Sequence, residues 1–252
     1  MRERGFFPRL ALINLVRNRR FYGPYLLSCG GTTAMYYVLR YLAGSDALAS
    51  VRGAAYLQAM MTIGCGVVAL FAAVILLYAD SFVRKRRQRE LGLYNILGLE
   101  KRHLARMMGW ETLFCALVSI GGGLAAGAAL SRLIPPLLLG MVRIPMTWTF
   151  RLSGPAMGET AALLAVLFAG TLAVDLFRLG RSRPVELLRS AETGEREPGT
   201  KGLLAVLGVL TLGGGYGLAV TVQDPVQALA WFFAAVLLVM IGTYGLFTAG
   251  SI

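Results

Sequence analysis

The chain is short of charge, of acidic residues and of the side chains that bind metals. Only 15% of its 252 residues are charged, 13 are acidic against 25 basic, and there is a single histidine. A soluble domain covers its surface with more polar side chains, whereas 56% of this chain is hydrophobic. The shortage of charge therefore argues against an ordinary soluble domain and favours a protein embedded in a bilayer.

The scarce cysteines and histidine also argue against a metal centre or a disulfide framework. Cys29, Cys65 and Cys115 all lie in apolar runs, where we expect small packing residues. His103 has no second ligand at suitable spacing, so no metal is predicted. Residues 194–201, GEREPGTK, have the glycine spacing of a phosphate-binding loop but lack its Lys-Ser/Thr pair and a preceding strand. No cofactor site is expected in this chain, and any ATP would be bound elsewhere.

Long apolar runs dominate what is present. Six are long enough to cross the roughly 30 Å hydrocarbon layer of a bilayer. They are residues 21–43, 56–79, 110–130, 156–177, 203–222 and 228–249. The sequence therefore predicts an all-α, polytopic membrane protein with about six transmembrane helices.

The basic residues predict the orientation of these helices. Segments 1–20, 80–109 and 178–202 hold 6, 8 and 6 Lys or Arg, which is 20 of the 25 in the chain. Loops rich in Lys and Arg stay in the cytoplasm, so these three segments and the N-terminus are predicted to be cytoplasmic. The apolar sixth run continues to Ile252 with no basic residue after it, so we also expect the chain to be part of a longer protein.

Shorter patterns predict local features of the helices. Residues 6–17 suggest either an amphipathic helix at the inner interface or ordinary flanking sequence, with Leu10, Ile13 and Leu15 or Val16 near one face and Arg9 and Arg17 elsewhere. The prolines of residues 131–155 favour an irregular outer connection. The glycine clusters at 121–127 and 213–217 have the GxxxG spacing that allows close helix packing.

The stretch RKRRQRELGLYNILGLEKRH, residues 84–103, combines basic residues with a short apolar face. Its first part is interpreted as anchoring at anionic headgroups. In its second part, Leu93, Ile96 and Leu97 share a face of a predicted short helix between Gly92 and Gly98. That face needs the bilayer surface, neighbouring helices or a partner protein to cover it. A nucleic-acid site is disfavoured because no aromatic platform or second basic element accompanies it.

Two motifs resemble the FtsX-like permeases of ABC transporters. One is Arg89-Glu90-Leu91-Gly92-Leu93 with Leu97-Gly98 and a glutamate, Glu111, at the next span; the other is Arg183-Pro184-Val185-Glu186-Leu187-Leu188-Arg189 after the fourth span. The resemblance covers residues 56–190. With the short outer loop at 44–54 and a following pair of spans, the layout is most similar to BceB-type permeases of peptide-antibiotic resistance.

This resemblance implies a function, partners and site residues. It implies a bacterial plasma-membrane permease subunit, not itself an enzyme, that works with a separate ABC ATPase holding ATP and Mg²⁺. It also implies a role in antimicrobial-peptide export, resistance or sensing, contacts with lipid and with a peptide antibiotic or lipid-linked target, and a sensor histidine kinase as a further partner. The implied ATPase-coupling residues are Arg89, Glu90, Leu91, Gly92, Leu93, Tyr94, Leu97 and Gly98. A secondary cytoplasmic contact is implied at Pro184, Glu186, Leu187, Leu188 and Arg189.

The expected organisation has three parts. Residues 1–55 carry an interfacial helix, the first span and a short outer loop; residues 56–190 form the permease unit with a coupling helix at 84–103; residues 191–252 hold a linker and two further spans. The alternative is an ATP-independent secondary transporter with six helices. A membrane enzyme is the weakest interpretation, because no nucleophile, base or metal ligands are grouped in the sequence.

Overall fold

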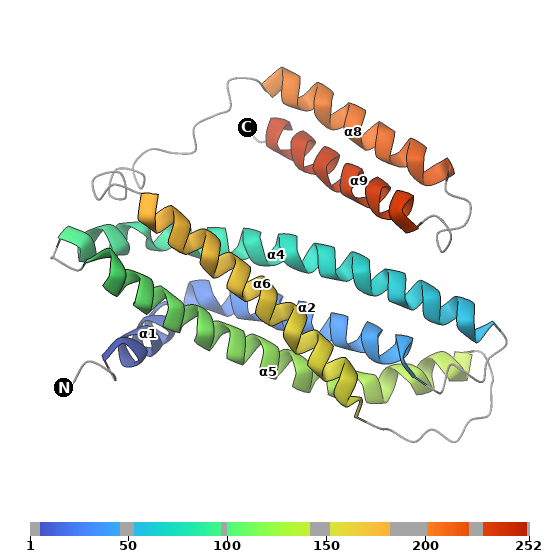
Figure 1. Ribbon diagram of the computed structural model, residues 1–252, viewed down its shortest axis with the longest axis horizontal. Coiled ribbons are helices and arrows are strands. Elements are labelled where there is room, and N and C mark those ends of the chain that lie inside the picture. Colours follow the sequence, from blue (N-terminus) through green and yellow to red (C-terminus); the bar gives the residue numbers. More distant parts are fainter. Residues whose placement is uncertain are drawn as a thin grey trace. The chain divides into compact units, whose positions relative to one another are not determined.

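A computed structural model describes residues 6–45, 53–96, 100–141, 152–181, 201–221 and 229–250. Every regular element in these residues is an α-helix, as predicted (Figure 1). The helices are α1 (Phe6–Arg17), α2 (Arg19–Ala43), α4 (Ala54–Ile96), α5 (Lys101–Met141), α6 (Gly154–Arg181), α8 (Lys201–Thr221) and α9 (Leu229–Gly250). They divide into two compact units, residues 1–194 and 195–252.

A helix occupies each of the six predicted spans, but the helices are not equally apolar. Among the residues that the structure describes, three stretches are long and apolar enough to cross a membrane: Ala55–Lys85, Lys101–Leu133 and Gly154–Arg181. The apolar parts of α8 and α9 are shorter, and α2 carries arginines at both ends. By length and composition, three helices of the described residues can therefore span a membrane, as a multi-pass helical protein requires.

Two helices are longer than the apolar runs that predicted them. The 43 residues of α4 would extend about 65 Å at 1.5 Å per residue, about twice the thickness of the hydrocarbon layer. The helix runs through Gly92 to Ile96, so the predicted start of a separate short helix at Gly92 was wrong. Likewise, α5 continues to Met141, so residues 131–141, which were expected to belong to an irregular connection, are helical.

In unit 1, α2 is the central helix. It lies between α4 and α5, while α6 crosses and contacts all three of these helices (Figure 1). Although α4 and α5 are consecutive in the chain, they make few contacts with each other. The main core joins Tyr25 and Cys29 of α2 to Leu76 of α4, Cys115 of α5 and Phe168 of α6. Helix α2 thus organises the packing of α4, α5 and α6.

Two glycines allow α2 and α5 to approach closely. A Cβ atom on Gly123 would lie 2.4 Å from the Cβ of Thr33, and one on Gly127 would lie 2.8 Å from the Tyr37 ring. Both distances are shorter than side-chain carbons tolerate, so only glycine fits. These two residues form the GxxxG pair of the 121–127 cluster, which confirms the tight packing predicted there.

Unit 2 is a pair of helices, α8 and α9, that lie side by side. Here Gly215 of α8 packs against Val239, and Gly242 of α9 packs against Leu212. The GxxxG pair of the second cluster, Gly213 and Gly217, has nothing within 4 Å of its hypothetical Cβ atoms among the described residues. The close contact between α8 and α9 therefore involves Gly215 of that cluster and not the GxxxG pair.

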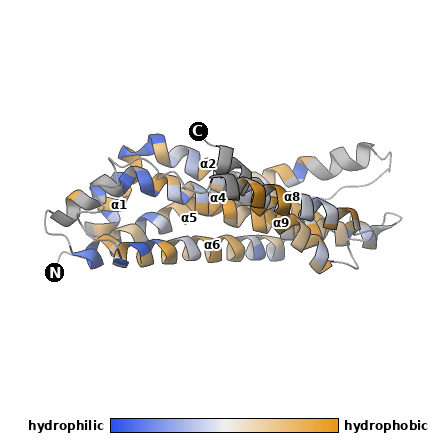
Figure 2. Cartoon of the chain, turned by 90° about the horizontal axis from the view of Figure 1, so that it is seen from above, coloured by the Kyte–Doolittle hydropathy of each residue, from blue (hydrophilic) through white to orange (hydrophobic). Residues whose placement is uncertain are grey.

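Polar residues are distributed unevenly along unit 1. Figure 2 shows apolar residues along much of its helices and hydrophilic residues concentrated toward the end where α1 lies. This end contains α1, the arginine-rich part of α4 and the first turns of α5. We call it the basic end, and the charged side chains described next lie there.

Candidate functional site: a buried charge cluster at the basic end

Two arginines of the RKRRQR stretch point into unit 1 instead of into solvent. Arg84 and Arg87 lie on the last part of α4, three residues apart, so both fall on one side of the helix. The Arg87 residue is only 7% exposed, and the Arg84 side chain is 13% exposed. The interpretation of this stretch as a headgroup anchor was therefore wrong for these two residues.

Arg84 connects α4 to α6. Its guanidinium forms ion pairs with Asp80, one turn earlier on the same helix, and with Asp175 of α6. The three side chains are between 7% and 16% exposed. At such burial each charged side chain needs an oppositely charged partner, because an isolated charge removed from water would be strongly unfavourable.

Arg87 connects α4 to α2 and α5. Its Nη1 group donates hydrogen bonds to the Tyr22 hydroxyl of α2, at 2.7 Å, and to Glu111 of α5. Asn14 of α1 donates from Nδ2 to the other Glu111 oxygen, Oε1, at 3.3 Å. Arg87 Nε lies 3.5 Å from the Glu90 carboxylate, one turn later on α4. We call Asp80, Arg84, Arg87, Glu111, Asp175, Tyr22 and Asn14 the charge cluster.

The charge cluster surrounds a cavity of about 50 Å³. Three carboxylates and two guanidiniums line it, together with the Tyr22 and Tyr25 rings. Arg84 Nε and Nη1 and Arg87 Nη2 face this region without a hydrogen-bond partner among the described residues. The volume and the polar lining suit a few water molecules.

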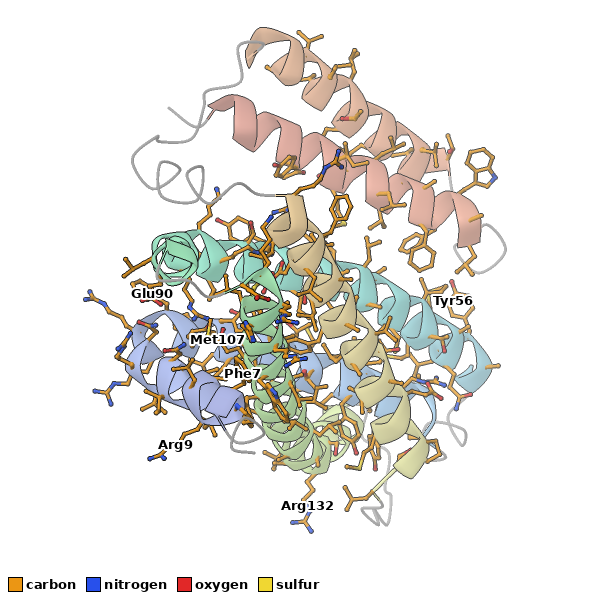
Figure 3. The ribbon with its side chains drawn as sticks, turned by 60° about the vertical axis from the view of Figure 1, so that its left-hand side comes forward. Phe7, Arg9, Tyr56, Glu90, Met107 and Arg132 are labelled. Atoms are coloured by element: carbon orange, nitrogen blue, oxygen red, sulfur yellow. The ribbon has the colours of Figure 1, made fainter. Side chains whose placement is uncertain are left out.

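Beside the charge cluster, the first turns of α5 contact both α1 and α6. Leu104, Met107 and Met108 of α5 form a small core with Leu179 of α6, and Phe7 and Leu10 of α1 pack against it. Figure 3 shows Phe7 and Met107 directed toward the interior of this end. The Lys101 ammonium also donates to the Gly180 carbonyl of α6 at 2.9 Å. A displacement of the start of α5 would therefore reach both neighbouring helices.

The charge cluster links the helices of unit 1 to one another. Ion pairs and hydrogen bonds tie α1, α2, α4, α5 and α6 together within one small region. No group of three or more histidines, cysteines or acidic residues that could hold a metal occurs in the described part of the chain.

The predicted coupling residues occupy the last turns of α4 beyond the charge cluster. The side chain of Glu90 is 35% exposed, and Leu93 is 52% exposed. Arg89, Leu91, Gly92 and Tyr94 also belong to α4, but their side chains lie outside the described residues. Leu97 and Gly98 fall outside the described residues altogether, as do the predicted secondary contacts Pro184, Glu186, Leu187, Leu188 and Arg189.

Sequence reasoning missed the charge cluster because most of its pairs are distant in the chain. The spacing of Asp80 and Arg84 is visible in the sequence as an i, i+4 pair. The pairs Arg84–Asp175 and Arg87–Glu111 depend on how α4, α5 and α6 pack. Glu111 was noted in the sequence as part of the permease motif, but nothing in the sequence assigned a partner to it.

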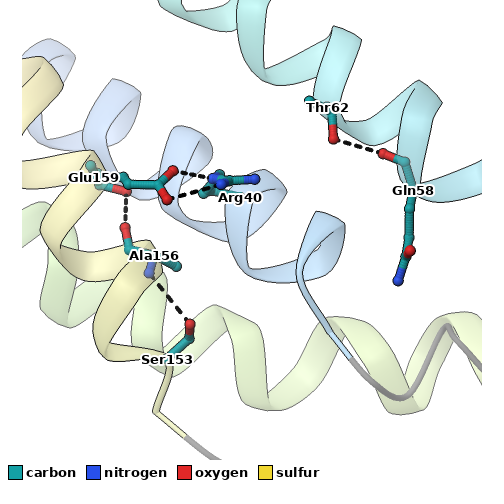
Figure 4. Close-up of polar contacts among 7 residues, drawn as sticks. Arg40, Gln58, Thr62, Ser153, Ala156 and Glu159 are labelled. Atoms are coloured by element: carbon teal, nitrogen blue, oxygen red, sulfur yellow. Dashed lines mark hydrogen bonds and ion pairs between the residues drawn. The ribbon is translucent and has the colours of Figure 1, made fainter.

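A second ion pair joins α2 and α6 at their opposite ends. Arg40 of α2 and Glu159 of α6 form a two-point contact, with Nη2 to Oε1 at 2.9 Å (Figure 4). Nearby, the Ser153 hydroxyl accepts a hydrogen bond from the Ala156 amide at 3.4 Å, as side chains preceding a helix commonly do. The Arg40 and Glu159 side chains are 31% and 48% exposed, so this pair contributes about 0–1 kcal/mol.

Comparison with known proteins finds a family that matches part of unit 1. Residues 62–179 match the family described as FtsX-like permease C-terminal. The chain is 27% identical over 245 residues to the uncharacterized ABC transporter permease YvcS of Bacillus subtilis, covering 96% of the chain and 38% of that protein. It is 25% identical over 260 residues to the bacitracin export permease protein BceB of the same organism, covering 97% and 39%.

A third relative, the ABC transporter permease protein YxdM of Bacillus subtilis, is 24% identical over 249 residues, covering 98% of the chain and 39% of that protein. The chain thus spans about two fifths of the length of the curated relatives it matches. The family match includes most of α4, all of the clearly apolar part of α5 and most of α6. It leaves out α2, although α2 lies at the centre of the packing in unit 1.

Proposed function

The chain carries the FtsX-like permease segment of ABC transporter permeases at residues 62–179, and from this premise we propose that it couples a separate ATPase to movement of membrane helices. The relatives and the apolar helices place it in a bacterial plasma membrane as a multi-pass protein. The observation that carries the proposal is α4, which continues past its apolar stretch to Ile96 and holds Arg84 and Arg87 inside the charge cluster.

The coupling starts at the end of α4. The partner ATPase pushes on the segment from Arg89 to Gly98, with contacts from Glu90, Leu93, Tyr94 and Leu97. Because Arg84 and Arg87 belong to the same continuous helix, a displacement of its end pulls directly on Asp175 of α6 and Glu111 of α5. The helices then shift as packed rods, as in hinge and shear transitions of other proteins.

The proposed topology has six spans and a cytoplasmic N-terminus. The segments rich in Lys and Arg support it through the positive-inside rule. In this orientation the charge cluster, the end of α4 and the segment from Pro184 to Arg189 all lie on the cytoplasmic side. The ATPase then has one face to contact, and Pro184, Glu186, Leu187, Leu188 and Arg189 supply a secondary support.

The partner ATPase binds ATP and Mg²⁺, and this chain contributes no cofactor site. The similarity to a bacitracin export permease supports a role in resistance to antimicrobial peptides, through export or sensing. A peptide antibiotic or its lipid-linked target is then the ligand of the complete transporter, and a sensor histidine kinase is a further partner. The charge cluster itself faces neither of these ligands, because its polar groups are directed toward one another.

Leu93→Asp is expected to abolish co-purification of the full chain with its ATPase. Leu93 is 52% exposed, so the substitution removes apolar contact area and places a charge in the proposed interface without disturbing the core of unit 1. The measurement is the amount of ATPase recovered on an affinity-tagged permease extracted from membranes in mild detergent.

Leu93→Ala serves as the matched variant, because it removes contact area without adding charge. We expect intermediate recovery for Leu93→Ala, and wild-type levels of membrane insertion for both variants. Normal ATPase recovery with Leu93→Asp would contradict the assignment of the α4 end as the coupling surface. Absence of any ATPase on the wild-type chain would contradict the proposed function as a whole and favour an ATP-independent transporter.

A further inference from the structure

The two faces of α1 differ from those predicted from the sequence. Ala11 and Asn14 are buried at 0% and 2% exposure, and Phe7 stacks on the His103 ring of α5 at 5.8 Å between centroids. These three residues follow one another at helical spacing and form the face packed on α5. Leu10 belongs to this side, so the expectation that Leu10 and Ile13 share a face was wrong.

The opposite face of α1 is exposed and apolar at its centre. Leu12, Ile13 and Val16 are 48%, 50% and 66% exposed. Arg9 and Arg17 lie on the same face, because positions 9, 12, 13, 16 and 17 follow the i, i+3, i+4, i+7 and i+8 pattern of one helix side. Figure 3 shows Arg9 pointing away from the bundle. We call these five residues the outer face of α1.

The order of side chains along the outer face fits one kind of partner. Three aliphatic side chains lie between two arginines, and two further exposed arginines, Arg19 and Arg20, begin α2. A protein groove would leave several like charges to be neutralised, whereas a bilayer surface offers acyl chains to the aliphatic groups and phosphates to the guanidiniums. No acid in the described part of the chain forms an ion pair with Arg9 or Arg17.

We propose that the outer face of α1 is a binding surface for anionic phospholipids of the bilayer in which the chain lies. Leu12, Ile13 and Val16 enter the boundary between headgroups and acyl chains, and Arg9 and Arg17 bind lipid phosphates. The opposite face carries Asn14, whose amide is hydrogen-bonded to Glu111. Lipid binding therefore sets the position of a helix that belongs to the charge cluster, and the lipid composition regulates the network that joins α4 to α5.

The test measures where the outer face lies when the full chain is in a bilayer. A nitroxide is attached at Ile13→Cys, and its accessibility to oxygen and to a water-soluble nickel chelate is compared in nanodiscs. The nanodiscs contain phosphatidylcholine alone or phosphatidylcholine with phosphatidylglycerol. The native cysteines are 0%, 5% and 2% exposed, so the label is directed to position 13, and a label at Glu100→Cys provides a reference site.

With phosphatidylglycerol, we expect the position-13 label to be accessible to oxygen and several-fold less accessible to the nickel chelate than the Glu100 label. Arg9→Gln with Arg17→Gln should raise nickel accessibility several-fold, because the attraction of the two arginines to the anionic headgroups is lost. Arg9→Lys with Arg17→Lys keeps the charge and should keep the protection. Removing phosphatidylglycerol should have the same effect as the glutamine substitutions.

Two results would overturn the proposal. A label equally accessible to nickel in both lipid mixtures would mean that the outer face does not bind anionic lipid. Protection that arises only when the ATPase is added would assign the face to a protein partner instead. Neither result depends on the coupling role of Leu93, so this inference can fail while the proposed function holds.

Discussion

Arg87→Met is expected to lower the free energy of unfolding of the full chain by about 3–5 kcal/mol. The substitution leaves Glu111 as a buried carboxylate, at 5% exposure, without its cationic partner. It also removes the hydrogen bond to the Tyr22 hydroxyl. The measurement is the midpoint and slope of chemical denaturation in detergent micelles, followed by circular dichroism.

A double substitution tests whether the loss of stability comes from leaving Glu111 without its cationic partner. Arg87→Met combined with Glu111→Leu removes both charges, and we expect it to recover most of the lost stability, because an apolar pair of similar volume often replaces a buried ion pair without loss. Arg102→Met is the matched control: its partner is Glu100, and both side chains are more than half exposed, so the expected loss is about 0–1 kcal/mol. Equal losses for Arg87→Met and Arg102→Met would contradict the buried position of Arg87.

Gly123→Ala is expected to destabilise the chain by about 1–3 kcal/mol. The added methyl group would lie 2.4 Å from the Thr33 Cβ and 2.6 Å from the Gly30 carbonyl oxygen, so α2 and α5 must separate. Part of that obstacle is backbone, which cannot rotate away as a flexible side chain can. The same denaturation experiment measures the change.

Gly122→Ala, at the preceding residue of α5, is a strict control for this prediction. A Cβ atom there meets nothing within 4 Å among the described residues, and alanine has a higher helix propensity than glycine. We expect it to be neutral or stabilising by up to about 1 kcal/mol. If both substitutions had the same effect, the close approach of α2 and α5 at Gly123 would be refuted, since helix propensity alone treats the two positions alike.

The order of the helices could be predicted from the sequence because it depends on local composition. The apolar run at 156–177 lies in α6, Gly154–Arg181, and the apolar run at 21–43 lies in α2, Arg19–Ala43. Hydropathy is a property of consecutive residues, so a membrane span can be predicted from it without knowledge of the packing. The GxxxG pair at Gly123 and Gly127 was also recognisable, since its spacing places both glycines on one face of the helix.

The ends of the helices, and the side chains that face neighbouring helices, were harder to predict from the sequence. Gly92 was expected to start a separate helix, but one glycine costs only about 1 kcal/mol in a helix interior, and α4 continues through it to Ile96. The arginines of residues 84–89 were expected to behave alike as headgroup anchors. In fact Arg87 is buried, whereas Lys85 is exposed, because only some positions of α4 face α2 and α5.

The sequence by itself determined that this protein is an all-helical membrane protein, that its positive charge gathers in three segments, and that it resembles FtsX-like permeases. These properties depend on neighbouring residues and short motifs. Only the tertiary structure decided that Arg84 pairs with Asp175, that Arg87 pairs with Glu111, and that the two faces of α1 have different partners. The reason is physical: an ion pair between helices depends on their separation and rotation, which arise from the packing of the whole unit around α2.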